Sequence, residues 1–147
     1  MNTPRKVVTQ ALFTLLTGAY KFTRAARVPV VPSNVSPSDS PAFFLVKPRE
    51  IDSEPQAYGA KRYDLLYGAL VYIPVDSIEG STEYLDQIDD IADAIDNALQ
   101  SPYPGSPQTL GGLVAQCAID GGMEIVGGGI LGQMCALVVP IRIVTGM

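Results

Sequence analysis

The chain has 147 residues, of which 47% are hydrophobic and 17% are charged, and its formal net charge is −5. A chain of this length is usually one domain, and folding can bury roughly two-thirds of the surface that the unfolded chain exposes. Without a histidine, it lacks the commonest general base and metal ligand at neutral pH, which argues against triad and cysteine–histidine catalysis. We therefore expect one domain over residues 1–147 that is not an enzyme and holds no metal or cofactor.

The first predicted element is a helix over residues 4–17. Thr3 and Pro4 form a typical helix start, and Gly18 is a typical end. Apolar residues recur along it at spacings of three and four: Val8, Leu12, Leu15, Leu16 and Ala19. Interspersed threonines argue against a signal peptide, and no run reaches the roughly 18 apolar residues of a membrane span. Residues 20–27 mix aromatic and basic side chains and are compatible with a short strand.

Residues 28–41 have the sequence VPVVPSNVSPSDSP. Its four prolines exclude a helix and disfavour a paired strand, so we predict a long exposed arm. Loops of this length in a compact domain are uncommon and are often functional. The valines of the arm show no periodicity that would bury them, so we expect a partner chain to cover them: Val28, Val30, Val31 and Val35.

Two strands are predicted next, over residues 42–47 and 62–75, because these segments are rich in β-branched and aromatic residues. Gly68 is the predicted site of a β-bulge in the second. A helix then begins at Ser81 and Thr82. One face of this helix is apolar: Leu85, Ile88, Ile91, Ala92, Ile95 and Leu99. The other face is acidic: Asp86, Asp89, Asp90, Asp93 and Asp96.

The last two strands are predicted over residues 113–120 and 133–145, with a glycine-rich turn over residues 121–132 between them. Pro140 has no N–H group, so the final strand is expected to lie at a sheet edge or to meet a neighbour irregularly there. The element order is helix, strand, strand, helix, strand, strand. It predicts an α+β fold, with one mixed or antiparallel sheet of about four or five strands packed against two main helices.

Charge is distributed unevenly along the chain. Residues 1–27 contain five basic residues and no acidic residue, so the remaining residues together carry a charge of −10. Between residues 76 and 96 every charged residue is acidic. A protein polarised in this way can meet copies of itself head to tail, because complementary charge guides register. The alternatives are a solvated helix face and an acidic surface that lines a cavity.

Cys117 and Cys135 are predicted to be buried, reduced thiols, which is typical of a protein made in the cytoplasm. The spacing of Gly127, Gly129 and Gly132 matches the dinucleotide-binding pattern G-x-G-x-x-G. That pattern needs a helix after it, whereas a strand is predicted here, so a hairpin connection is the preferred interpretation. The aspartates of the second helix cannot wrap a cation from one straight helix, so no metal site is predicted.

Several stretches together resemble the tail terminator, or tail completion, family of long-tailed bacteriophages. They are, in order, ALFTLLTGAYKFTRAAR, PAFFLV, LLYGALVYIPV, LDQIDDIADAIDNAL, SPQTLGGLVAQCAIDGG and VVPIRIVTG. The resemblance covers nearly the whole chain through the order and spacing of these stretches. It implies a homohexameric ring at the head-proximal end of the virion tail, assembled in the host cytoplasm. Such a ring stops tube polymerisation and joins the tail tube protein to a head-completion or neck protein, while DNA passes through its lumen without specific binding.

The residues expected at subunit or partner interfaces are the basic residues near the N-terminus, the valines of the arm and the aspartates of the second helix. They are Arg5, Lys6, Arg24, Arg27, Val30, Val31, Val35, Asp86, Asp89, Asp90 and Asp93. Alternative functions are another phage neck or head-closure protein, a small-molecule-binding domain that uses the glycine-rich turn, and a secreted or pilus-like subunit.

Overall fold

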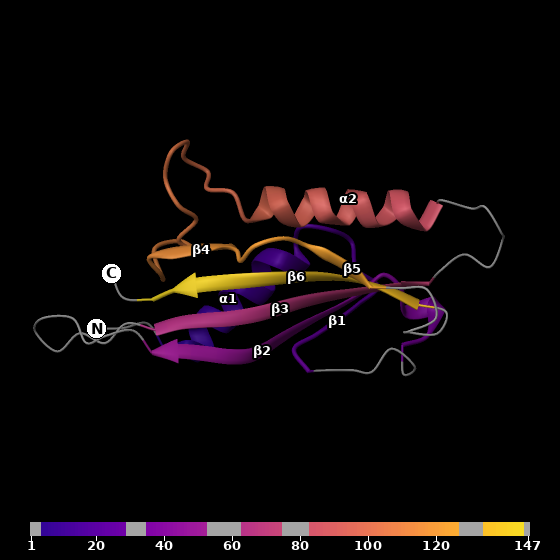
Figure 1. Ribbon diagram of the computed structural model, residues 1–147, viewed down its shortest axis with the longest axis horizontal. Coiled ribbons are helices and arrows are strands. Elements are labelled where there is room, and N and C mark those ends of the chain that lie inside the picture. The colour runs from indigo at the N-terminus through magenta and orange to yellow at the C-terminus, as the bar shows by residue number, and fades with distance from the viewer. Residues whose placement is uncertain (1–3, 29–34, 53–62, 75–82, 127–133, 146–147) are drawn as a thin grey trace, which may run out of the picture.

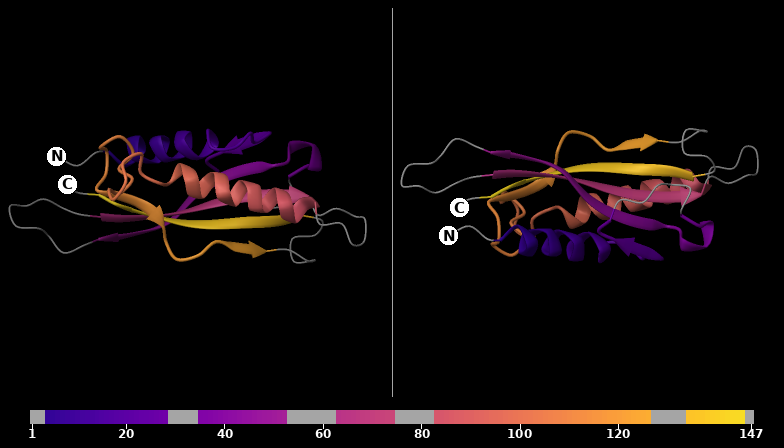
Figure 2. Two further views of the ribbon diagram at one scale, coloured as in Figure 1. Left: turned by 90° about the horizontal axis from the view of Figure 1, so that it is seen from above. Right: turned by 90° about the horizontal axis from the view of Figure 1, so that it is seen from below.

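The computed structural model describes residues 4–28, 35–52, 63–74, 83–126 and 134–145. These residues form an α+β fold in two layers, with two α-helices on one face of a six-stranded mixed sheet (Figures 1 and 2). The predicted class is therefore confirmed, but the predicted number of strands was too low. The additional strands are β1 (Arg24–Ala26) and β5 (Glu124–Val126), and their three residues each are too few to show a clear alternation.

Three long strands form the centre of the sheet: β2 (Ala42–Asp52), β3 (Tyr63–Pro74) and β6 (Met134–Val144). The strand order is β1-β2-β3-β6-β4, where β4 spans Gln116–Ile119. β1 runs parallel to β2, and the other pairings are antiparallel. β4 and β5 pair one after the other with the same side of β6. The segment predicted as a glycine-rich turn thus contains β5.

The prediction that β6 lies at a sheet edge was wrong, because β6 has neighbours on both sides. The alternative, an irregular meeting at Pro140, is confirmed. Pairing with β5 ends at Val138 and pairing with β4 begins at Ile141, so Pro140 lies where β6 has no paired strand on that side. The Pro140 carbonyl there accepts a hydrogen bond from the Asp120 N–H at 2.8 Å.

The predicted β-bulge is present, but on the strand that faces Gly68. The register between β2 and β3 shifts between Val46 and Arg49, while Gly68 itself pairs regularly with Val46. A Cβ atom at Gly68 would lie 3.3 Å from a methyl carbon of Val46. Glycine at this position therefore allows the two strands to approach closely next to the bulge.

Helix α1 (Arg5–Thr17) packs Val8, Leu12 and Leu16 against the sheet, while Leu15, expected on that face, is only partly buried. Helix α2 (Glu83–Ala98) buries its isoleucines and the leucine that follows it: Ile88, Ile91, Ile95 and Leu99. Leu85 was predicted to share this buried face, but 38% of it is exposed. No helix in the described ranges is long and apolar enough to cross a membrane.

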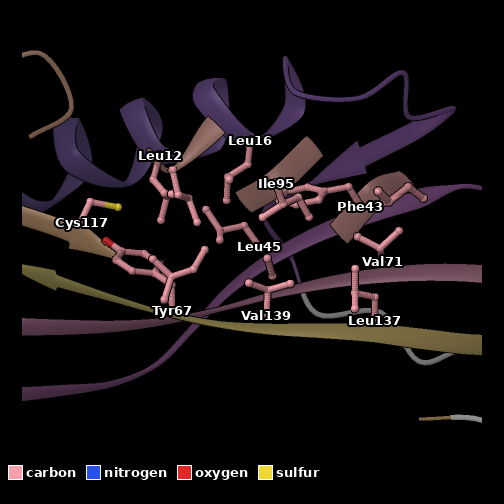
Figure 3. Packing of buried hydrophobic residues seen from close by; sticks show 14 of the residues in the cluster. Leu12, Leu16, Phe43, Leu45, Tyr67, Val71, Ile95, Cys117, Leu137 and Val139 are labelled. Atoms are coloured by element: carbon pink, nitrogen blue, oxygen red, sulfur yellow. The ribbon is translucent and has the colours of Figure 1, made fainter. Parts of the chain in front are cut away.

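The main core lies between the helices and the sheet. Figure 3 shows Leu12 and Leu16 of α1 and Ile95 of α2 directed toward side chains of the three long strands. Both cysteines are free and buried, as predicted, and Cys117 and Cys135 belong to this core. Burial raises the pKa of the Cys117 thiol to about 12, so this group stays protonated at neutral pH.

The prediction of an exposed arm was wrong for Val35, whereas Ser36 and Ser38 are exposed as predicted. The prolines were expected to exclude a helix, but Pro37–Asp39 form a short 3-10 helix. Val35 is only 5% exposed and packs in a second apolar cluster on the sheet face away from the helices, with Phe44 and Tyr72. The Thr23 N–H donates to the Pro41 carbonyl at 2.9 Å, which fastens this segment to the chain before β1. Val28 is 57% exposed, while Val30 and Val31 lie outside the described residues.

Candidate subunit interface

Three of the four basic residues expected at an interface gather around one cavity. Arg5 and Lys6 occupy the first turn of α1, and Arg27 directly follows β1. Together with Lys47 of β2 they line a cavity of about 240 Å³, named the basic pocket below. The parallel pairing of β1 with β2, in which Ala26 lies beside Phe44, brings the segments that carry Arg27 and Lys47 to the same place.

One carboxylate organises part of this pocket. Glu50 accepts hydrogen bonds from the Lys47 Nζ at 2.8 Å and from the Arg5 Nε at 2.7 Å. The hydrogen bonds from Lys47 and then Arg5 hold the pKa of Glu50 below its usual value. The Arg5 guanidinium also lies 4.3 Å from the centre of the Tyr63 ring. Arg5 and Lys47 are thus held in place and partly neutralised.

The charges of Lys6 and Arg27 remain free to bind an anionic group. Among the described residues neither has an ion-pair partner, and Arg27 donates one hydrogen bond to the Gln10 Oε1 at 3.1 Å. Thr9 and Tyr67 also line the pocket, with their hydroxyl groups 2.7 Å apart. Burial raises the pKa of Tyr67, so its hydroxyl stays neutral. Four cations and one carboxylate leave this region with a net charge of +3, which suits an anionic group.

Arg24, the fourth basic residue expected at an interface, does not line the basic pocket. Its guanidinium lies 3.7 Å from a carboxylate oxygen of Asp39 and 5.4 Å from the centre of the Phe44 ring. These contacts hold the segment 35–41, which includes Asp39, against β1 and β2. Arg24 thus has a role within its own chain, as does Val35.

The four aspartates expected at an interface are all exposed on the outer face of α2: Asp86, Asp89, Asp90 and Asp93. In the described part of the chain none of them has an ion-pair partner. Leu85 lies on α2 one turn before Asp89 and adds an apolar side chain to this acidic surface.

The two charged surfaces lie toward opposite edges of the molecule. In Figure 1, α2 runs along the edge that carries β4 and β5, whereas β2, which contributes Lys47 to the basic pocket, lies at the other edge. Both helices also carry charge that their own dipoles disfavour. α1 has basic residues and no acidic residue in its first turn, and α2 has Asp96 and no basic residue in its last turn.

An apolar groove adjoins the basic pocket. It encloses about 780 Å³ between α1, which contributes Val7, Ala11 and Leu15, and the segment 108–113. Lys6 lines both the groove and the basic pocket, so the two are neighbours on either flank of α1. The groove is absent from the expectations above, because it forms between segments about 100 residues apart.

Side-chain hydrogen bonds hold the far wall of this groove. The Gln108 Nε2 donates to the carbonyls of Ala98, at 3.3 Å, and Gln100, at 2.9 Å, and its Oε1 accepts from the Leu110 N–H at 3.1 Å. Leu110 has a φ of 53°, which is unusual for a residue with a branched side chain. Such strain persists only when the surroundings impose it, and it places Leu110 in the groove wall.

Possible metal ligands and the glycine motif are the remaining candidate features. Among the described residues, no three side chains of His, Cys, Asp or Glu come together in a way that could hold a metal ion. The motif of Gly127, Gly129 and Gly132 lies outside the described residues, but β5 precedes it and β6 follows it, so no helix follows as a dinucleotide site requires. No protein-family model matches the chain, and no curated protein sequence matches it significantly.

Proposed function

We propose that this chain is a structural virion protein that assembles head to tail into a ring on the end of a bacteriophage tail tube. By its resemblance to tail terminators, the ring contains six copies, stops tube polymerisation and offers a surface to a head-completion or neck protein. The alternative within the same class is another neck or head-closure protein. It differs in its position in the particle and in the number of subunits in its ring.

The observation that supports this proposal best is the separation of opposite charges. A ring requires a heterologous interface, in which each subunit uses two different and complementary faces. The basic pocket beside α1 and the exposed aspartates of α2 are two such surfaces, and β2 of the pocket and α2 lie toward opposite edges of the sheet. Two surfaces of opposite sign on one face would instead favour a twofold-related contact, which closes at a dimer.

The cost of these charges to the folded monomer supports the same conclusion. Cations at a helix N-terminus and anions at a helix C-terminus each lower helix stability by roughly 0.3–1 kcal/mol at low salt. Lys6 stands at the first kind of position and Asp96 at the second, whereas the charge of Arg5 is already offset by Glu50 in its own chain. A partner of opposite charge would offset this cost, and a neighbouring copy supplies one. Acids left free in the ring would repel DNA that passes through the lumen.

Mass measurement tests the proposal directly. Sedimentation velocity of the isolated protein should show a monomer or an oligomer whose size rises with concentration, because a ring formed on a template needs weak contacts that the template reinforces. Addition of purified tail tube protein should produce a ring visible by electron microscopy at tube ends and should stop tube growth. A stable dimer at all concentrations, with no effect on tube length, would contradict the proposal.

A further inference from the structure

We propose that the apolar groove and the basic pocket together form the receptor for α2 of a second copy. Leu85 enters the groove, and Asp89 and Asp93 face the cations around Lys6 and the basic pocket. This inference rests on the proposed head-to-tail assembly and specifies which side chains meet in it.

The receptor has two parts that lie on opposite flanks of α1. Arg5 and Thr9 border the basic pocket, whereas Val7 and Ala11 border the groove, and Lys6 borders both. An α-helix with its side chains is about 10–12 Å wide, so the two parts are separated by roughly that distance. A ligand that fills both must therefore present an apolar group and an anionic group about 10–12 Å apart.

The exposed face of α2 meets this requirement. A helix rises 1.5 Å per residue, so Leu85 and Asp93 lie about 12 Å apart along its axis. Asp89 stands halfway between them, at about 6 Å from each, which is the place that Lys6 occupies between the two parts of the receptor. An exposed leucine is ordinary by itself. Leu85 differs because its distances to Asp89 and Asp93 match the distances between the two parts of the receptor.

Charge and shape favour a second copy over a small apolar ligand as the occupant. Lys6 lines the groove, and Arg27 in the adjoining basic pocket has no ion-pair partner among the described residues. A small apolar ligand in the groove would leave both cations without an anionic partner. Within one chain α2 lies along the edge of the sheet that carries β4 and β5, away from β2 (Figure 1), and among the described residues none of its aspartates forms an ion pair with the receptor. Contact therefore requires two copies.

Cross-linking tests the apolar part of the contact. Full-length V7C and L85C proteins are mixed and treated with a short bismaleimide, and dimers are counted on a denaturing gel. Val7 is 44% exposed in the groove, and the native thiols are buried, so the new cysteines carry the reaction. The matched control pairs V7C with I125C, because Ile125 is also exposed but lies on β5. We expect several-fold more dimer with L85C, and equal yields in the two mixtures would overturn the inference.

Complementary charge variants test the ionic part. The K6E/R27E variant reverses the charge of two receptor residues and leaves α2 unchanged. The D89K/D93K variant reverses the charge of two residues on the acidic face of α2 and leaves the receptor unchanged. Each variant alone should associate at least about tenfold more weakly than the wild type, because like charges then meet across the contact. Mixed together they should associate again in alternating order, because each contact between the two variants joins opposite charges. Thermal melts and the milder K6Q/R27Q variant separate loss of contact from loss of folding.

The outcomes separate this inference from the proposed function. If the wild type forms rings on tube ends while the charge variants do so equally well, the docking of α2 is wrong and the tail-end function stands. If L85C cross-links selectively to V7C but tube growth is unaffected, the contact is real and the tail-end function is wrong. Self-association of K6E/R27E at wild-type strength would overturn the inference directly.

Discussion

Replacement of Ile95 by alanine should show how strongly α2 is held on the sheet. Ile95 is fully buried between α2 and the three long strands (Figure 3). The change removes three buried carbon atoms, worth about 2.4 kcal/mol at roughly 0.8 kcal/mol each. The cavity left behind adds to this, so we expect a loss of about 3–4 kcal/mol, within the range of about 2–5 kcal/mol for such sites.

A urea titration followed by circular dichroism measures this loss. For a small protein with a slope of about 1–3 kcal/mol per molar urea, a loss of 3 kcal/mol lowers the midpoint by about 1–3 M. The matched control is Asp90→Asn, an exposed and nearly isosteric change on the opposite face of α2, which should alter stability by less than about 0.5 kcal/mol. Equal midpoints for the two variants would show that the assignment of the helix faces is wrong.

Three further predictions concern contacts outside this core. Glu50→Gln should lower the melting temperature more at pH 7 than at pH 3, because a lowered folded-state pKa contributes stability that is fully present above the unfolded value of about 4.3 and is lost as pH falls through the folded-state pKa; an equal difference at both pH values would refute this. Gln108→Ala should cost about 1–3 kcal/mol in a thermal melt, against no change for Ser106→Ala. Val35→Ala should cost about 1–2 kcal/mol while exposed Val28→Ala is silent, and a silent Val35→Ala would show that this segment does not pack.

Local periodicity predicted both helices and the strands β3 and β6 closely, but it ended β2 at residue 47, whereas the strand continues to Asp52. The burial of Ile88, Ile91 and Ile95 follows from their spacing alone, because one face of a regular helix must meet the sheet. Leu85 belongs to the same pattern and lies in the first turn of α2, but 38% of it is exposed. The pattern shows which face of a helix is apolar, but it does not show which residues of that face are covered.

The prediction that Val35 lies in an exposed arm was wrong for a related reason. The prolines of the arm were expected to exclude a helix and to disfavour a paired strand; the described part has no paired strand but does contain the 3-10 helix Pro37–Asp39, and prolines do not exclude packing. Val35 is buried by the sheet face opposite the helices, and that face is apolar only because Phe44 and Tyr72 alternate with core residues along long strands. The two-residue period was visible in the sequence, yet which loop returns to cover the second face depends on topology.

The sequence predicted most of the charged residues that form the candidate interface, but it did not predict how they are grouped in space. Clustered basic residues near the N-terminus and clustered aspartates in the second helix were both evident from composition along the chain. The basic pocket, however, needs Lys47 and Glu50, which join Arg27 only through the parallel pairing of β1 with β2. Pairing between distant segments leaves no local signal, and both residues were missed for that reason.

The shortness of the outer strands affects how this molecule can meet its copies. In the described part of the chain, the sheet ends on one side in β1, with three residues, and on the other in β4 and β5, which the stretch beside Pro140 separates. A long open edge would let another chain add a strand through backbone hydrogen bonds and so form fibres without limit. In the described residues β1 covers only Ala42, Phe43 and Phe44, so the outer side of β2 from Leu45 to Asp52 has no paired strand. The register shift between Val46 and Arg49 and the charged side chains of Lys47, Arg49 and Glu50 lie in this stretch, and both features disfavour the addition of a strand. Copies of this chain are therefore expected to meet through side chains rather than through backbone pairing.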